Sequence, residues 1–381
     1  MRGKKRMRTS LVKALQVASL LSLSLCLLLT GCGRESEASS YSSTRFLMGT
    51  VVSIEIHTNS AAKAVPTKAQ LQEAVIGALQ RMEEVEAQTN RYEATGSSDC
   101  QRIAEAAGTG TYVPVREDLY LLLDKVRQRN HPLIDLSLGP LIDVWDKARE
   151  SETLPASEAV AEALGLTGMD KVLLSREVPS AEGKGTGQEE DYAGSVMLTQ
   201  KGMSLDFGAV AKGYAVEKAW NSLRASGLPI YGIINAGGNI KTLGQKPDGS
   251  PWKIGITDPM EKTQTMGNLT LDPDEAVATS GDYQKYFEVD GVRYHHLLDP
   301  VTGYPGMYNR SVLIVASDGF DTDYYSTLLF LMPAEEALAL AEKLPEIETI
   351  IVSRENQIYV SSGLKRRIEW TYQGGYSIVT P

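Results

Sequence analysis

The sequence predicts an α+β fold in which mixed or antiparallel sheets pack against helices. Three observations support this class. Segment 49–58 alternates between apolar and polar residues, as a half-buried strand does. Segment 66–89 repeats its apolar residues at the spacing of a helix. From residue 196 onward, antiparallel-looking hairpins alternate with helices, and no internal repeat is present.

The later elements are expected in this order. A second helix is expected over 117–130. Segment 175–195 is polar, rich in glycine and without a period, so it predicts a long surface hairpin tip or an insertion. A helix from about 210 to 225 follows, with Gly227 placed to end it in the left-handed conformation, and 230–234 is an apolar strand. The remaining expected elements are strands at 252–256, 310–316, 349–353, 358–361 and 368–372, and a helix from 333 to 344.

The first 31 residues have the three parts of an export signal. Six basic residues come first, an apolar run spans 14–29, and Leu29-Thr30-Gly31-Cys32 closes the segment. This ending resembles the lipobox of bacterial lipoproteins, in which the cysteine, here Cys32, becomes the lipidated first residue. An uncleaved N-terminal anchor is the alternative. Both predict a location at the extracytoplasmic face of the cell membrane.

The mature chain is expected to be a tethered single domain. Residues 32–44 are rich in serine and lack periodicity, which predicts a flexible tether. The rest, 45–381, has enough apolar residues for a core. Because Cys26 leaves with the signal and Cys32 is acylated, Cys100 would have no disulfide partner, and we expect it to be a packing residue.

The charge argues against nucleic acid as a partner. The formal net charge is −10, and the first 31 residues carry six basic and no acidic residues, so their removal would leave −16. Such a body is repelled by phosphate backbones and by anionic lipid head groups. An anionic substrate would therefore need a local cation, either Mg²⁺ or a placed lysine.

Three features point to chemistry on a phosphate-bearing molecule. Asp323 and Thr327 offer a carboxylate and a hydroxyl four residues apart, and such hard oxygen ligands suit Mg²⁺, which completes its shell with substrate phosphates. Lys212 lies at an expected helix start, where a lysine and backbone amides form a natural phosphate site. His296 has the ordinary pKa of a general base, although the sequence leaves a swap of roles with His295 open.

Seven short blocks follow one another along the chain. They are Met48-Gly49-Thr50, 135–141, 206–215, 235–239, 279–283, 296–303 and 323–327. With these blocks the chain resembles the ApbE family, the FAD:protein FMN transferases, from about residue 44 to about residue 344. The resemblance implies an enzyme that binds FAD and Mg²⁺, cleaves the pyrophosphate, moves FMN onto a threonine hydroxyl and releases AMP. It further implies that this threonine lies in a Ser/Thr-Gly-Ala-Thr-like motif of a membrane or exported flavoprotein.

The resemblance also assigns roles to residues. Contacts to FAD are implied at Met48, Tyr92, Leu133, Ile134, Asp135, Asp206, Lys212 and Leu297. The metal is implied on the main-chain carbonyl of Ala209 with Asp323 and Thr327, and His296 matches the histidine suspected of activating the acceptor. Three positions depart from the family pattern: Ser137 for Thr, Glu217 for Asp and Asn239 for Asp.

Two other functions remain open from the sequence. A Mg²⁺-dependent FAD pyrophosphatase would use the same pocket with water as the acceptor, giving FMN and AMP. A lipid-anchored FAD-binding protein would do no chemistry at all. The metal ligands Asp323 and Thr327 weigh against this second alternative, because a pure receptor has no need to polarise a pyrophosphate.

Overall fold

The computed structural model describes residues 40–59, 62, 64–92, 98–178, 192–372 and 374–379. The expected export signal and Cys32 lie outside these residues. The chain divides into two units, residues 1–36 and residues 37–381, and the architecture described below is that of the second unit. Within the described part of the chain, no helix is both long and apolar enough to cross a bilayer.

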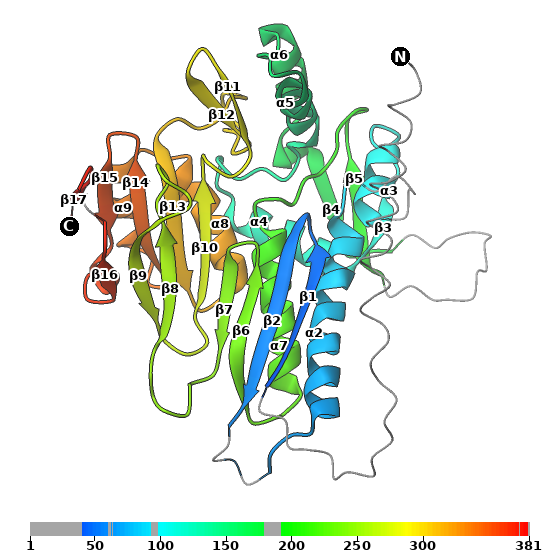
Figure 1. Ribbon diagram of the computed structural model, residues 1–381. Coiled ribbons are helices and arrows are strands. Elements are labelled where there is room, and N and C mark those ends of the chain that lie inside the picture. The colour runs from blue at the N-terminus through cyan, green and yellow to red at the C-terminus, as the bar shows by residue number, and fades with distance from the viewer. Residues whose placement is uncertain are drawn as a thin grey trace, which may run out of the picture. The chain divides into compact units, whose positions relative to one another are not determined.

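The largest sheet of the described residues has the strand order β1-β2-β6-β7-β10-β13-β14-β15-β17 (Figure 1). Its neighbours pair antiparallel except for β15 and β17, which are parallel. Its strands are β1 Ser40–Leu47, β2 Thr50–Thr58, β6 Ile230–Ala236, β7 Asn239–Leu243, β10 Ala276–Gly281, β13 Asn309–Ala316, β14 Ile347–Ser353, β15 Gln357–Val360 and β17 Ser377–Val379.

Each face of this sheet packs against its own layer. Along β13, Val312 and Ile314 belong to the core shared with the helices, whereas Leu313 and Val315 belong to the core on the other face. The helices of the first layer are α2 Lys68–Thr89, α7 Ala211–Ala225, α8 Gly319–Phe330 and α9 Ala334–Ala341. The second layer is a three-stranded sheet of β8 Trp252–Thr257, β9 Thr265–Leu271 and β16 Ile368–Trp370.

Local signals in the sequence start and stop the helices of this layer. Thr67 and Gln70 form a reciprocal capping box at the start of α2. The Asp318 side chain accepts the Phe320 N–H at 2.8 Å and caps α8. Gly227 follows α7 with φ of +66°, the left-handed conformation expected of it.

The remaining elements lie beyond the two layers. A small sheet joins β3 Val113–Arg116, β5 Tyr192–Leu198 and β4 Val172–Ser175, next to α3 Asp99–Glu105 and α4 Glu117–Arg129. A separate cluster joins α5 Gly139–Ser151 and α6 Ser157–Gly165 to the hairpin of β11 Tyr286–Val289 and β12 Val292–His295. The described residues also include two short 3₁₀ turns, at Met169–Lys171 and Ser362–Leu364.

The α+β prediction is confirmed, and one expected boundary is wrong. Strand β1 begins at Ser40, so the last five residues of the tether predicted at 32–44 are not a free linker. Its backbone pairs with β2 from Ser40 opposite His57 to Leu47 opposite Thr50. Backbone hydrogen bonds order this polar edge strand, although its side chains carry no strand signal. Most of the insertion predicted at 175–195 lies outside the described residues, but the antiparallel β4 and β5 flank it as a hairpin.

Candidate functional site

The candidate site forms where helices α7 and α8 cross. Gly213 and Gly319 face each other there, and a Cβ on either residue would overlap the carbonyl oxygen of the other. Only glycine permits so close an approach of two backbones. The crossing places Asp323, one turn further along α8, against the first turn of α7.

Asp323 replaces a backbone acceptor at the start of α7. Its Oδ2 accepts the Gly213 N–H at 3.0 Å. In a regular first turn this N–H would donate to the carbonyl of Ala209, four residues earlier. No described donor takes its place, so the Ala209 carbonyl oxygen is free for another partner. Asp323 as a whole is 5% exposed, and this hydrogen bond holds its carboxylate in place.

Thr327 lies one turn after Asp323, on the same face of α8. Its Oγ1 is 3.5 Å from the Oγ of Ser280 at the end of β10, and Ser280 lies 2.9 Å from the Oγ of Ser326. In the described part of the chain, no three His, Cys, Asp or Glu side chains gather as a metal site. The donors here are one carboxylate, hydroxyls and a carbonyl, a set that fits Mg²⁺ and leaves room for water or phosphate ligands.

Lys212 adds a positive charge at this crossing. Its ammonium lies 3.7 Å from Asp323 Oδ1 and donates to the Gly208 carbonyl at 3.1 Å. The Asp206 carboxylate accepts the Gly208 N–H at 2.8 Å and shapes the turn before the helix. A lysine, a helix N-terminus and a shaped turn together favour an anionic group.

Glu217 holds the start of α8. Its Oε2 accepts the N–H of Gly319 at 2.8 Å and pairs with the ammonium of Lys241 at 2.5 Å. Lys241 is 1% exposed and also donates to the Ser317 carbonyl at 2.7 Å. Glu217 therefore links α7 to the helix that carries Asp323.

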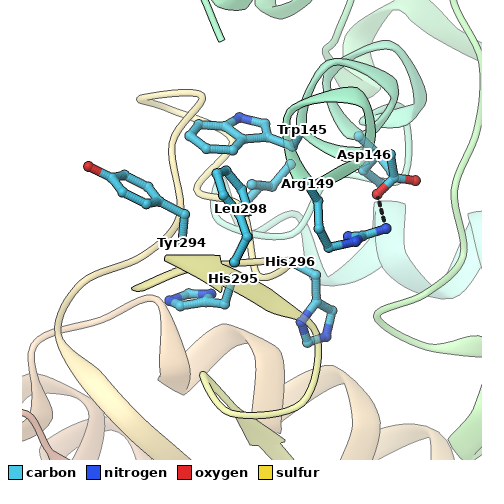
Figure 2. A pocket seen from close by; sticks show the side chains of 9 residues that line it. Trp145, Asp146, Arg149, Tyr294, His295, His296 and Leu298 are labelled. Carbon is cyan, nitrogen blue, oxygen red and sulfur yellow. Dashed lines mark ion pairs between the residues drawn. The ribbon is translucent and has the colours of Figure 1, made fainter. Parts of the chain in front are cut away.

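His295 ends β12 and His296 follows it. The two histidines have different environments, and Figure 2 shows their rings turned to different sides of the chain. His295 is 2% exposed. Its Nδ1 accepts the Leu297 N–H at 3.3 Å, so its Nε2 carries the proton and donates to the Gly306 carbonyl at 2.8 Å. Burial lowers the pKa of His295 to about 4. Its fixed tautomer makes His295 a structural residue.

His296 is the histidine with spare hydrogen-bonding capacity. Its backbone N–H donates to the Lys285 carbonyl at 3.1 Å, while its Nδ1 has no partner among the described residues. Burial, then the neighbouring His295, Lys285 and Lys212, lower the pKa of His296 to about 3. The ring is therefore neutral near pH 7 and able to accept a proton.

The comparisons with known proteins agree with this geometry. The model of the ApbE family matches residues 48–351. The chain belongs to the ApbE family. Two relatives, each named FAD:protein FMN transferase, come from Klebsiella pneumoniae and Treponema pallidum. The first is 34% identical over 64% of this chain and 71% of the relative, and the second is 30% identical over 88% and 91%.

Solved ApbE structures share the fold. The ApbE protein from Thermotoga maritima superposes with a TM-score of 0.71 at 28% identity, over 86% of this chain and 99% of that one. The apo flavinyl transferase ApbE from Pseudomonas stutzeri superposes with a TM-score of 0.65 at 27% identity, over 83% and 92%. Both the family and the α+β class predicted from the sequence are thus confirmed.

The other residues implied by the ApbE resemblance lie on several elements. Met48, at the tip of the β1–β2 hairpin, donates its N–H to Glu86 at 2.7 Å. Asp135 accepts the N–H and hydroxyl of Ser137 at 2.7 and 2.6 Å, and burial raises the pKa of its carboxyl group. Tyr92 is 65% exposed and available to a ligand. Ile134 and Leu297 are buried in the main hydrophobic core, and Leu133 is half-buried and packs against it.

Sequence reasoning missed Arg91, which links several of these residues. Its guanidinium lies 5.0 Å over the ring of Tyr92 and 3.9 Å from Asp206, and it contacts Asp143 at 3.0 Å. An arginine next to an expected ligand residue was the available signal. Ser280 was also missed, although the block 279–283 that contains it was among the seven that carry the family resemblance. Cys100 is buried and its Sγ donates to the Leu205 carbonyl, as expected for a packing residue.

Proposed function

We propose that the protein is a Mg²⁺-dependent FAD:protein FMN transferase. It moves FMN from FAD onto a threonine hydroxyl of an exported or membrane flavoprotein and releases AMP. The observation that carries the proposal is the α7–α8 crossing, where the Gly213 N–H goes to Asp323 and leaves the Ala209 carbonyl free. The relatives' name, FAD:protein FMN transferase, supports the transfer of FMN from FAD to a protein.

The residues at the α7–α8 crossing would have different roles in the transfer. Asp323, Thr327 and the Ala209 carbonyl would hold Mg²⁺, which supplies positive charge at the diphosphate of FAD. Lys212 adds a fixed positive charge close to Asp323. Catalysis of phosphoryl transfer is mainly positioning and electrostatics, so rigid placement by two packed helices is what the reaction requires.

His296 acts on the acceptor. Its neutral ring takes the proton from the threonine hydroxyl as the oxygen bonds to the phosphorus of the FMN moiety. The bond from that phosphorus to the bridging oxygen breaks, and AMP leaves with the electron pair. A pKa of about 3 makes a weak base, but the negative charge of a bound diphosphate raises the pKa of a neighbouring imidazole and strengthens it.

We also propose that the protein lies outside the cytoplasm, tied to the membrane through a lipid on Cys32. The basic and apolar segments and the lipobox-like ending support this location. The acceptor motif implied by the resemblance belongs to membrane and exported flavoproteins, which such an enzyme could reach. Cys32→Ala should release the protein from the membrane fraction, and retention of that variant by membranes would argue for an uncleaved anchor.

One assay tests the reaction. The chain lacking residues 1–32 is incubated with FAD, Mg²⁺ and an acceptor domain bearing a Ser/Thr-Gly-Ala-Thr segment. Protein-bound flavin fluorescence that survives denaturation supports transfer. Free FMN without bound flavin would identify a pyrophosphatase, and unchanged FAD a binding protein.

Two variants test the assigned roles. Asp323→Ala should abolish turnover and its Mg²⁺ dependence, whereas Glu336→Ala, an exposed carboxylate of α9, should change neither. His296→Ala should slow transfer about 100-fold or more while sparing FAD affinity; His57→Ala on β2 is its control. Full activity of Asp323→Ala would remove the metal assignment, and a large loss of FAD affinity in His296→Ala would make that residue a pocket wall.

A further inference from the structure

A buried arginine lies where three segments of the chain meet. Arg91 comes two residues after the end of α2, and its guanidinium reaches Gly139, the first residue of α5, and the segment 204–206 before α7. The Arg91 side chain is 9% exposed. A charged side chain is rarely buried to this degree unless its charge and its donors are matched by partners.

The short contacts of Arg91 fall on one of its three nitrogen atoms. Nη2 donates to the Gly139 carbonyl at 3.0 Å and lies 3.4 Å from the Ser204 hydroxyl. It also contacts Asp143 at 3.0 Å, but this carboxylate is 51% exposed and therefore screened by water. Nε and Nη1 are buried and have no hydrogen-bond partner among the described residues. An apolar side chain of similar length would fill this space without unpaired donors, so stability alone does not account for an arginine here.

The same guanidinium lies next to two of the residues implied in FAD binding. It is 5.0 Å over the ring of Tyr92, and its Nε is 3.9 Å from Oδ2 of Asp206. Tyr92 is 65% exposed, so a planar ligand can reach the part of the ring that the cation leaves open. The other oxygen of Asp206 accepts the Gly208 N–H at 2.8 Å. Arg91 thus joins an aromatic ring and a carboxylate from distant parts of the sequence.

Charge gives a second reason for an arginine at this place. Asp143 and Asp206 both lie beside Arg91, in a chain whose formal net charge is −10. Without a cation, two carboxylates would repel the diphosphate of an approaching FAD. Lys212 supplies positive charge beside Asp323, and Arg91 supplies it beside these two carboxylates.

We propose that Arg91 is a positioning residue for FAD, which holds the Tyr92 ring and the Asp206 carboxylate in a fixed arrangement and offsets the charge of that carboxylate. The inference rests on the proposed transferase function and adds a residue that lies in none of the seven blocks of the family resemblance. Arg91 affects the reaction through the binding of FAD and takes no part in the transfer of the phosphoryl group.

Arg91→Met tests this role, because methionine fills similar space without the charge and the donors. In the full-length protein in detergent, the dissociation constant for FAD, measured by titration of flavin fluorescence, should rise about 10-fold or more. The transfer rate at saturating FAD and acceptor should stay within about threefold of the parent rate, because the described contacts of Arg91 include neither His296 nor Asp323. Arg91→Lys, which keeps the charge and loses the planar fork, should bind FAD with an intermediate constant.

Arg102→Met is the matched control for this change. Arg102 also pairs with a carboxylate, Asp99 at 2.8 Å, and also lies over a tyrosine ring, that of Tyr192 at 5.6 Å. Neither partner is implied in FAD binding, so the dissociation constant for FAD should stay within about twofold of the parent value. Urea unfolding of both variants shows whether each is folded under the assay conditions.

A combined variant separates positioning from a general loss of packing. If Arg91 acts through Tyr92 and Asp206, Arg91→Met should raise the dissociation constant less than about threefold in a protein that already carries Tyr92→Leu and Asp206→Asn. A rise in that background as large as in the parent would show that Arg91 acts independently of them and would overturn the proposal. An unchanged constant in Arg91→Met alone would overturn it as well.

The transferase function is judged by a different measurement. Protein-bound flavin in the parent, together with an unchanged FAD constant in Arg91→Met, would overturn the inference and leave the transferase function intact. FAD binding without protein-bound flavin would overturn the transferase function, whereas a raised FAD constant in Arg91→Met would still support the role of Arg91.

Discussion

Gly213→Ala tests whether the crossing of α7 and α8 positions the metal ligands. The added Cβ would overlap the Gly319 carbonyl oxygen and lie 2.7 Å from the Cβ of Asp323, where ordinary contact begins at 3.4 Å. The Asp323 contact alone requires a shift of about 0.7 Å, and the overlap with Gly319 requires more, so we expect the helices to part by about 1 Å. The 3.0 Å hydrogen bond from Gly213 to Asp323 then breaks.

Gly213→Ala should affect Mg²⁺-dependent transfer more than it affects the stability of the fold. Overpacking costs about 1–3 kcal/mol, partly offset by about 1 kcal/mol because alanine is the better helix former. Mg²⁺ demands near-ideal geometry, and a misplacement of about 1 Å costs about 100-fold in rate. Transfer rates measured across a Mg²⁺ titration should reach half of their maximum at a higher Mg²⁺ concentration than in the unsubstituted protein. The maximal rate should also be lower.

Gly165→Ala at the end of α6 is the matched control for this change. Its added Cβ would meet no atom within 4 Å, so we expect unchanged rates and Mg²⁺ dependence. Urea unfolding of both variants shows whether each is folded under the assay conditions. If folded Gly213→Ala matched the parent in rate and Mg²⁺ dependence, the crossing would not be what places the ligands.

The buried pair that holds α8 and the two histidines give further predictions. Glu217→Gln leaves the Lys241 ammonium buried without a carboxylate, so urea unfolding should show that the free energy of unfolding falls by about 3 kcal/mol. Adding Lys241→Met should restore part of this loss. A Glu217→Gln variant as stable as the unsubstituted protein would contradict the prediction. His295 and His296 have folded-state pKa values of about 4 and about 3, below their ordinary 6.5, so between about pH 4 and 6.5 the unfolded chain binds more protons and stability falls as the pH falls. At about pH 5 each ring should contribute a loss of about 2 kcal/mol, and His296→Gln should flatten the measured slope; an unchanged slope would show that this ring is charged in the folded protein.

Segments with a clear amphipathic period were assigned correctly from the sequence, whereas the polar segment that forms β1 was predicted to be a flexible tether. The helix of α2 and the strand of β2 were predictable because the amphipathic period is written in consecutive residues. Strand β1 was not, because a polar edge strand is ordered by pairing with a neighbour and needs no apolar face. The hairpin of β11 and β12 and the helix α5 meet only in the folded chain, so their contact left no trace in the local sequence.

The sequence alone was sufficient for the family and the fold class, because motif order and residue chemistry are properties of the linear chain. It could not distinguish His295 from His296, since adjacent imidazoles differ only in what surrounds them. The tertiary structure shows that their surroundings differ: the Nε2 of His295 is bonded to the Gly306 carbonyl, whereas the Nδ1 of His296 has no partner among the described residues. It alone also showed why Gly213 is a glycine and what Glu217 holds, because both depend on α8, which begins about 100 residues later in the chain.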